Sequence, residues 1–290
     1  MTQIVETLAE VSDRYSALLV DLWGCVHNGV QAFPDAVAAL QKYRKGGGAV
    51  ILLTNAPRAR GPVSRQIAKL GVPDDAWDVI VTSGDSARSA MYRGVVGEKI
   101  WFIGQPHDQS FFEPLSVIQD PVTITQVPLE EAEGIICTGP FDPLADPDEM
   151  RAQFLYAKQK GLEMICANPD IVVDRGETRE WCAGALAALY RDMGGVAHYF
   201  GKPHPPIYDL AYRRLAAMGR DVDKARMLAI GDGAVTDIPG AMGEDIDAMF
   251  ISGGLAAAET KTEYQPDPDM LATYLADQQI APTYTIGFLR

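Results

Sequence analysis

The chain has 290 residues, of which 47% are hydrophobic and 8% aromatic, and its formal net charge at pH 7 is −14. This length and composition suit a soluble globular protein with one large or two medium domains. The acidic balance disfavours a nucleic-acid backbone or an anionic membrane surface, because both require clustered Lys and Arg. No apolar run is long enough to span a membrane. We therefore expect no nucleic-acid partner and no membrane association.

The cysteines and the N-terminal segment predict a cytoplasmic protein. The cysteines, Cys25, Cys137, Cys166 and Cys182, are scattered and form no Cys-x-x-Cys pair. This argues against a structural zinc site or a disulfide framework and fits a reducing compartment. Residues 1–10 contain two acidic residues and no basic one, unlike a secretory signal peptide.

Short apolar runs alternate with helical patterns along the first third of the chain. The predicted strands are 17–20, 49–53 and 79–83, and the predicted helices are 36–43, 63–70 and 85–92. The first run delivers Asp21 at its carboxyl end, where Gly24 and Gly29 allow a sharp turn. This alternation predicts right-handed βαβ units and a parallel sheet.

The alternation restarts at Lys99 and returns to its first form in the last third. We predict further strands over 100–103, 134–137, 163–167, 227–231 and 248–251, and helices over 148–160 and 206–218. Residues 105–131 are irregular and Pro-rich, and the tail from Thr260 is polar without a charge run. The simplest organisation is an α/β core of residues 1–85 and 195–290, interrupted by an inserted domain of residues 86–194.

Several polar residues follow predicted core strands or precede helices. They are Asp21, Thr54 with Asn55, Lys202, and Asp232 with Asp237. A carboxylate that attacks phosphorus must be shielded from the negative phosphoryl oxygens, and a divalent cation held by carboxylates provides that shielding. A hydroxyl, helix-start N–H groups and a lysine can hold the same oxygens. Each residue alone fits a helix cap, a turn or a solvated side chain, but the ordered set favours phosphoryl chemistry.

The sequence resembles class IIA of the haloacid dehalogenase-like (HAD) superfamily, which includes 4-nitrophenyl phosphatases, phosphoglycolate phosphatases and pyridoxal phosphate phosphatases. The matching segments are Asp21-Leu-Trp-Gly-Cys-Val, Leu53-Thr-Asn, Gly201-Lys-Pro-His-Pro, Gly231-Asp-Gly-Ala-Val-Thr-Asp-Ile and, within the insertion, Ala167-Asn-Pro-Asp. The resemblance covers nearly the whole chain. It implies a Rossmann-like core, a large inserted α/β cap domain and a Mg²⁺ cofactor.

The resemblance also implies roles for individual residues. Asp21 would be the nucleophile that forms an aspartyl-phosphate, and Thr54, Asn55 and Lys202 would hold the phosphoryl group. Mg²⁺ would be bound by Asp21, Asp232 and the backbone carbonyl of Trp23, with Asp237 as a further ligand or as support for the ligands. Homodimers formed through the cap are common among such relatives, so a homodimer is a further expectation, although the sequence shows no interface patch.

The chain departs from the family pattern at Trp23. Phosphatases of this superfamily usually carry a second aspartate there, which protonates the leaving oxygen and later activates water, and losing such a group typically costs about 10²–10⁴-fold in rate. His27 could supply the proton, but we favour a structural histidine that bonds the loop. Trp23 could form a wall for the substrate, but packing beneath the cap is the simpler interpretation.

Other residues near these motifs have competing interpretations. Cys25 could be a thiol nucleophile, but a small packed residue in a tight turn is the favoured interpretation. In the cap, Asn168, Asp170 and the 105–131 segment are candidates for contacting the leaving group.

The leading functional hypothesis is a Mg²⁺-dependent phosphatase acting on a small phosphorylated metabolite. The alternative is a weakly active or non-catalytic binder of phosphorylated ligands that lacks the general acid/base. Hydrolysis at carbon is disfavoured, because a metal-free displacement has no use for clustered Asp232 and Asp237.

Overall fold

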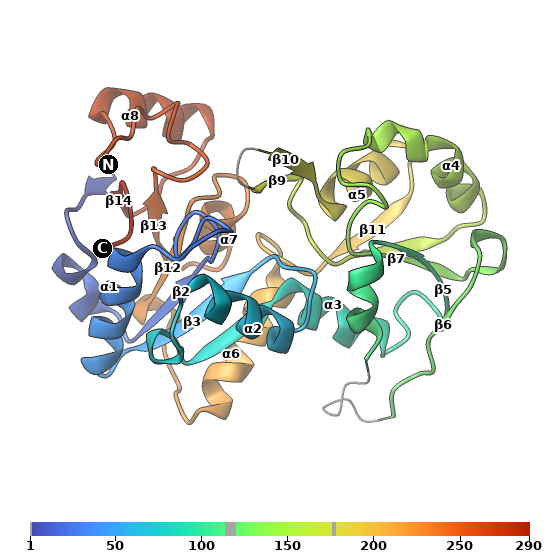
Figure 1. The fold of residues 1–290 in the computed structure, drawn as a ribbon, viewed down its shortest axis with the longest axis horizontal. Coiled ribbons are helices and arrows are strands. Elements are labelled where there is room, and N and C mark those ends of the chain that lie inside the picture. The colour runs from blue at the N-terminus through green and yellow to red at the C-terminus, as the bar shows by residue number, and fades with distance from the viewer. Residues whose placement is uncertain (1, 114–119, 176–177) are drawn as a thin grey trace. The chain divides into compact units, whose positions relative to one another are not determined.

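The computed structural model describes residues 2–113, 120–175 and 178–290, and it divides into two compact units (Figure 1). The first unit comprises residues 1–54, 63–81 and 208–290, and the second comprises 55–62 and 82–207. Each unit contains its own mainly parallel sheet with helices. The predicted class, an α/β protein with a Rossmann-like core and an inserted α/β domain, is confirmed.

The first unit is built on a seven-stranded sheet with the order β1-β14-β13-β12-β2-β3-β4. Its strands are β1 (Gln3–Ile4), β2 (Ala17–Val20), β3 (Ala49–Thr54), β4 (Val79–Thr82), β12 (Met227–Gly231), β13 (Asp247–Ile251) and β14 (Tyr284–Ile286). The pairings from β1 to β3 are all parallel. Every residue of β2, β3 and β12 is buried, as expected for central strands covered on both faces.

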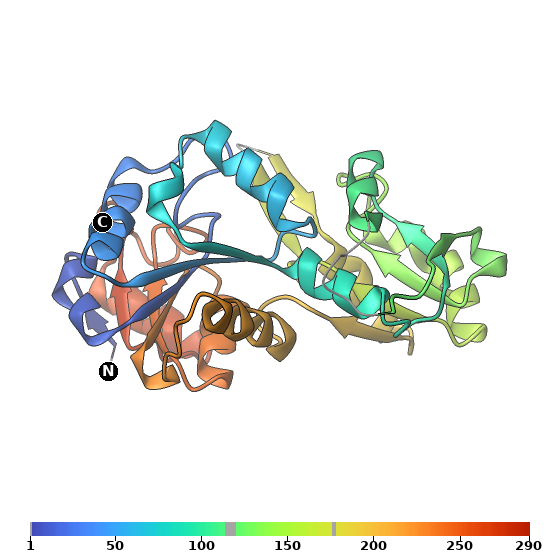
Figure 2. The same ribbon diagram turned by 90° about the horizontal axis from the view of Figure 1, so that it is seen from below.

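Helices cover this sheet on both faces. They are α1 (Pro34–Lys45), α2 (Arg60–Leu70), α6 (Pro205–Ala217), α7 (Asp237–Gly243) and α8 (Pro268–Asp277). Figure 2 shows α1 and α2, in blue, on one side of the strands and α6, in brown, on the other. α1 begins with Pro34, whose fixed φ suits the first helical turn, and it ends before Gly46-Gly47, where Gly47 has a φ of +94°.

The strand order places the predicted functional residues at one edge of the sheet. The chain runs from β2 outward to β3 and β4, and then returns to β12 on the other side of β2. The junction between β2 and β12 is therefore the topological switch point, where open α/β sheets bind their ligands. Asp21 follows β2, Asp232 follows β12, and Thr54 is the last residue of the neighbouring β3. The prediction that these three strand ends are adjacent is confirmed.

The second unit contains a five-stranded parallel sheet with the order β11-β8-β7-β5-β6 and a separate antiparallel hairpin, β9-β10. The sheet strands are β5 (Lys99–Ile103), β6 (Thr125–Gln126), β7 (Gly134–Cys137), β8 (Glu163–Cys166) and β11 (Val196–Tyr199). The hairpin consists of β9 (Val172–Arg175) and β10 (Thr178–Trp181). The helices are α3 (Ser83–Met91), α4 (Arg151–Gln159) and α5 (Ala183–Asp192).

Side chains that alternate along β7 separate two hydrophobic clusters in the second unit. Ile135 and Cys137 pack in one cluster with residues of α4 and α5, whereas Ile136 packs in the other with residues of α3. Successive side chains of a strand point to opposite faces, so this division shows that helices cover the two faces of the sheet. The second unit therefore has three layers.

Some elements differ from the sequence prediction. The predicted strand 79–83 ends at Thr82, whose hydroxyl accepts the N–H of Asp85 and thereby starts α3 one residue later. This capped helix start coincides with the unit boundary at 82, whereas the prediction placed the boundaries at 86 and 194. Helix α8 and strand β14, both in the polar tail, were not predicted.

Two further observations concern the predicted segments. Part of the irregular 105–131 segment, residues 114–119, lies outside the described residues. Among the helices that the structure describes, none combines the length and the apolar character needed to cross a bilayer.

Candidate active site

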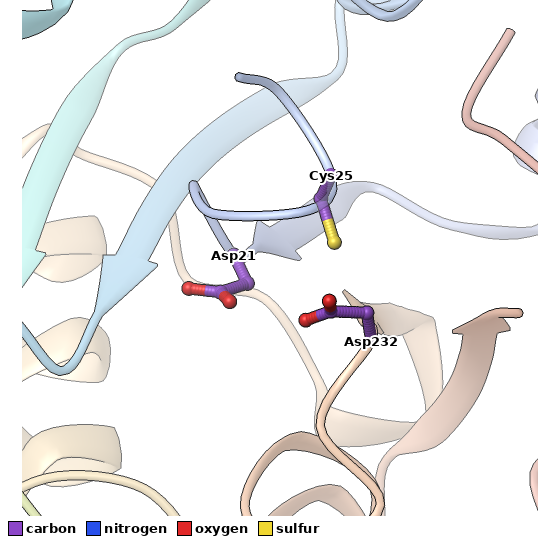
Figure 3. A group of neighbouring side chains, drawn as sticks. All are labelled: Asp21, Cys25 and Asp232. Carbon is purple, nitrogen blue, oxygen red and sulfur yellow. The ribbon is translucent and has the colours of Figure 1, made fainter. Parts of the chain in front are cut away.

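Three side chains at the switch point converge on one another. Ligand atoms of Asp21, Cys25 and Asp232 all lie within 4.8 Å of one another. In Figure 3 the Asp232 carboxylate points toward Asp21, and the Cys25 sulfur points toward the Asp232 carboxylate. Cys25 and Asp232 are buried and Asp21 is partly exposed, so the cluster opens to solvent on the side of Asp21. Two carboxylates held this close favour a cation between them.

Backbone features hold the Asp232 carboxylate in place. The N–H of Leu255 donates to Asp232 Oδ2 at 3.0 Å. A Cβ at Gly24 or at Gly254 would lie 2.1 Å from the same oxygen, so both positions must be glycine for the loops to approach the carboxylate this closely. Gly24 also has a φ of +70°, which a residue with a Cβ rarely adopts. The site thus fixes Asp232 before any ligand binds.

Asp237 supports the loop that follows β12. Its Oδ2 accepts the N–H of Gly233 at 3.1 Å and lies 3.4 Å from the Thr236 hydroxyl. Among the described residues, Asp237 is not part of the cluster of mutually close ligand atoms formed by Asp21, Cys25 and Asp232. These contacts show that Asp237 supports its own loop, and a metal contact of Asp237 stays a prediction.

Thr54 lies in the first unit, at the end of the strand next to the one that precedes Asp21. Thr54 is 2% exposed at the end of β3, the strand that pairs with β2. Contact between its hydroxyl and a phosphoryl group stays a prediction, as does a metal contact of the Trp23 carbonyl.

Trp23 packs against its own loop. A Cβ on Gly29 would lie 2.4 Å from two atoms of the Trp23 ring, so the indole covers Gly29 directly. The ring also meets His27 edge-on, with 5.1 Å between the ring centroids and 73° between the planes. Gly29 has a φ of +83°, so glycine is required there for both conformation and space. These contacts show that Trp23 packs within its own loop, and packing beneath the cap stays a prediction.

His27 is buried in its neutral form. Its side chain is 1% exposed, and its Nδ1 accepts the N–H of Gly29 at 3.1 Å, which requires that nitrogen to be unprotonated. Burial lowers the pKa of His27 from 6.5 to about 4. An imidazole with this pKa holds almost no proton at neutral pH and is a poor general acid. The loop-bonding interpretation is therefore favoured over the catalytic one.

In the second unit, Asn55 fixes the backbone at Lys202. Its Oδ1 accepts the Lys202 N–H at 2.7 Å, and its Nδ2 donates to the Lys202 carbonyl at 3.0 Å and to Asp170 Oδ1 at 2.8 Å. Both N–H groups of the Asn55 amide are thus engaged. Asn55 is 4% exposed and Lys202 is 2% exposed. Asn55 positions Lys202 and Asp170, and a phosphoryl contact by Asn55 stays a prediction.

Close packing holds this arrangement together. A Cβ on Gly201 would lie 2.5 Å from Asn55 Oδ1, 2.6 Å from Pro169 Cδ and 2.7 Å from Ser83 Oγ. Such distances do not occur for real Cβ atoms, so any larger residue at 201 must displace Asn55 or its neighbours.

The other predicted cap residue, Asn168, makes a local turn. Its Oδ1 accepts the N–H of Asp170 at 3.0 Å, and its carbonyl accepts a hydrogen bond from the Cys166 thiol at 3.3 Å. The side chain is 8% exposed. These contacts shape the Asn168-Pro169-Asp170 turn. A contact between Asn168 and a substrate stays a prediction.

The donor set can be tested against the cofactor that the sequence implies. Mg²⁺ prefers hard oxygen ligands and is commonly bound by one or two carboxylates plus water. Asp21 and Asp232 provide such carboxylates, and the Leu255 N–H holds one of them in place. The residues therefore fit a hard divalent cation.

The sequence underestimated two features of the site. Cys25 is the packed turn residue that was predicted, at 1% exposed, but the prediction did not include the proximity of its sulfur to the two carboxylates. The signal was its position one residue after Gly24, whose positive φ turns the chain back. The backbone N–H of Leu255 is a second such feature, which Gly253-Gly254 after β13 indicates as a close approach.

Fold and site together define a Rossmann-like α/β scaffold with a carboxylate pair at its switch point, and comparisons with known proteins identify the family. One family profile, described as haloacid dehalogenase-like hydrolase, matches residues 18–117, and a second, HAD-hydrolase-like, matches residues 199–278. A haloacid dehalogenase-like hydrolase from Brucella suis is 38% identical with a TM-score of 0.85, over 99% of this chain and 100% of that one. The chain belongs to the haloacid dehalogenase-like hydrolase family.

More distant structures share the fold. A 4-nitrophenylphosphatase from Thermotoga maritima is 19% identical with a TM-score of 0.69, over 95% of each chain. A glycerol phosphate phosphatase from Mycobacterium tuberculosis, solved with magnesium, is 22% identical with a TM-score of 0.64, over 84% of this chain and 69% of that one. A search among curated proteins gave no match. The haloacid dehalogenase-like superfamily expected from the sequence motifs is confirmed.

Proposed function

We propose that this protein is a Mg²⁺-dependent phosphatase that hydrolyses a small phosphorylated metabolite through an aspartyl-phosphate on Asp21. The observation that carries the proposal is the pairing of the Asp21 and Asp232 carboxylates at the switch point, with ligand atoms within 4.8 Å. Family membership and the phosphatase activities named for its structural neighbours support the same reaction class.

The chemistry has two steps on the same carboxylate. An oxygen of Asp21 attacks phosphorus, the bond from phosphorus to the leaving oxygen breaks, and the leaving group departs with the electron pair and takes its proton from water. Water then attacks the aspartyl-phosphate, which releases inorganic phosphate and restores the carboxylate. Splitting the reaction in this way requires a nucleophile that is fixed in place but accessible, and Asp21 is the partly exposed member of its cluster.

The surrounding residues would bind the cation and the phosphoryl oxygens, and so offset the negative charge of the site. A bound Mg²⁺ would supply positive charge that offsets both the carboxylates and the phosphoryl oxygens. Asp232 would hold the cation, and Asp237 would keep the loop after β12 in shape through the Gly233 N–H. In this proposal Thr54 and Lys202 bind the phosphoryl oxygens, and Asn55 presents Lys202 through its backbone.

A second candidate function is favoured by the loop that contains Trp23. Trp23 occupies the position where relatives carry the acid, and His27 beside it is neutral and buried. Neither side chain of this pair is suited to protonating a leaving alkoxide at neutral pH.

The second candidate is therefore a binder of phosphorylated ligands with slow turnover. As an enzyme, the protein should prefer substrates whose leaving groups depart without a proton.

Hydrolysis of 4-nitrophenyl phosphate with and without Mg²⁺ tests the proposal, because nitrophenolate leaves without protonation. We expect Mg²⁺-dependent turnover that Asp21→Asn lowers by at least about 10³-fold. Asp221→Asn, an exposed change of the same kind, is the matched control. Trapping a phosphoenzyme that is lost in Asp21→Asn would establish the intermediate. Phosphate binding without turnover would favour the second candidate, and equal rates in both variants would refute Asp21 as the nucleophile.

A further inference from the structure

Cys25 stands out in the carboxylate cluster because a thiol adds nothing to Mg²⁺ binding. Its sulfur lies within 4.8 Å of ligand oxygens of both Asp21 and Asp232, and it points toward the Asp232 carboxylate (Figure 3). The side chain is 1% exposed. The N–H of Gly24 donates to the carbonyl of His27 at 3.0 Å, so the turn that carries Cys25 is closed on itself. The sulfur is therefore held at the carboxylates by the backbone.

The donor set of this cluster differs from one built for a hard cation alone. Mg²⁺ takes oxygen ligands, whereas a thiolate selects softer cations such as Zn²⁺. One sulfur and two carboxylates, with water in the remaining position, satisfy the four-coordinate preference of Zn²⁺.

We propose that Cys25 is a metal-selectivity residue, whose sulfur joins the Asp21 and Asp232 carboxylates as a third ligand for a thiophilic divalent cation such as Zn²⁺. On binding, the thiol proton passes to solvent and a sulfur–metal bond replaces the S–H bond, so nothing is oxidised or reduced. The proposal uses the same carboxylates that the proposed function assigns to Mg²⁺. Its effect on catalysis therefore rests on the proposed function. Zn²⁺ would displace Mg²⁺ and occupy the nucleophile Asp21.

The other three cysteines are suitable controls. Cys137, Cys166 and Cys182 are buried in the second unit, and burial raises the pKa of each thiol, which keeps it protonated. In the described part of the chain, no other cysteine belongs to a cluster of three or more metal-ligating side chains. A metal–thiolate signal from the folded protein should therefore come from Cys25.

The experiment titrates the full-length protein with Cd²⁺, a spectroscopically visible substitute for Zn²⁺, and follows the ultraviolet sulfur-to-cadmium charge-transfer absorption. We expect one equivalent of Cd²⁺ to saturate the band. Cys25→Ala should abolish it and weaken Zn²⁺ binding at least about 10-fold, whereas Cys137→Ala should keep it. Asp232→Asn, which retains the thiol, should weaken binding of Cd²⁺, and excess Mg²⁺ should compete with it.

Zinc-edge X-ray absorption of the wild type requires no variant, so it applies even if Cys25→Ala fails to fold. One sulfur at about 2.3 Å together with oxygen ligands is expected. The proposal is overturned if the wild type shows no band, if Cys25→Ala keeps the band, or if the zinc spectrum shows only oxygen and nitrogen. These readouts do not depend on catalysis. A cadmium band without Mg²⁺-dependent hydrolysis would refute the proposed function alone, and hydrolysis without a band would refute this inference alone.

Discussion

Replacing His27 with Asn should remove a pH-dependent loss of stability that the wild-type protein suffers below about pH 6.5. The change is matched to the structure, because an Asn Oδ1 can accept the Gly29 N–H that His27 Nδ1 accepts at 3.1 Å. Asn does not titrate in this range. The comparison therefore isolates the proton of His27 and leaves the backbone bond in place.

The magnitude follows from the two proton affinities. Burial lowers the pKa of folded His27 to about 4, whereas the unfolded chain binds the proton near 6.5. Between these values the unfolded state carries the extra proton, so the free energy of unfolding falls as the pH falls. From about pH 7.5 to about pH 5, linkage gives a loss of roughly 2 kcal/mol from this residue. Above about pH 7 the contribution of His27 no longer changes with pH.

Urea denaturation of both proteins at the two pH values measures the effect. Other titrating groups are shared and cancel in the difference, including His204, whose pKa burial also lowers. The lost ring contact with Trp23 shifts the variant by the same amount at each pH. The difference in unfolding free energy should therefore move by roughly 2 kcal/mol in favour of Asn at acid pH. An offset that stays constant with pH would show that His27 is not held neutral.

The remaining predictions concern Trp23 and Gly201. Trp23→Asp should speed hydrolysis of alkyl phosphates by up to about 10²-fold and hydrolysis of aryl phosphates much less. Parallel assays of a folded variant on both kinds of substrate measure the difference. Equal gains would contradict the idea that the wild type lacks only a proton donor. Gly201→Ala should lower the thermal midpoint, because its Cβ would meet Asn55 Oδ1 at 2.5 Å, while Gly139→Ala, with no atom within 4 Å, should not. Equal midpoints in the two alanine variants would mean that the chain around Gly201 relaxes freely.

The fold could be predicted to the extent that its elements have local signals. Buried runs such as 17–20 and 49–53 are continuous and apolar, so strand position and parallel pairing followed. Strand β14 has only three residues in a polar tail, and its place beside β13 depends on contacts far away in the sequence. Helix α8 did have a signal, since Asp267 caps it and Pro268 opens it.

The two converging carboxylates of the site, Asp21 and Asp232, could be predicted from the sequence, whereas the contacts of other residues could not. Asp21 and Asp232 directly follow apolar runs that could be recognised as strands, and the order of the motifs along the chain indicated that these strands lie side by side. The hydrogen bonds of Asn55 cannot be deduced in this way, because they join residue 55 to residues 170 and 202. The contacts of Asp237 and Cys25 depend on the paths of two separate turns. The turn after β12 places Asp237 against its own loop, and the turn after β2 places Cys25 among the carboxylates.

Trp23, at the position where the sequence resemblance implies an acid, is part of a packed loop. The indole needs Gly29 beneath it, since a Cβ there would lie 2.4 Å from the ring, and its edge contact with His27 covers an imidazole that must remain neutral. His27 in turn holds Gly29 through Nδ1. Trp23→Asp therefore exposes a desolvated histidine beside a new carboxylate, which would raise the pKa of His27. Restoring the acid should then change both residues at once, so Trp23→Asp needs to be compared with Trp23→Asp combined with His27→Asn before its rate effect is assigned to the carboxylate.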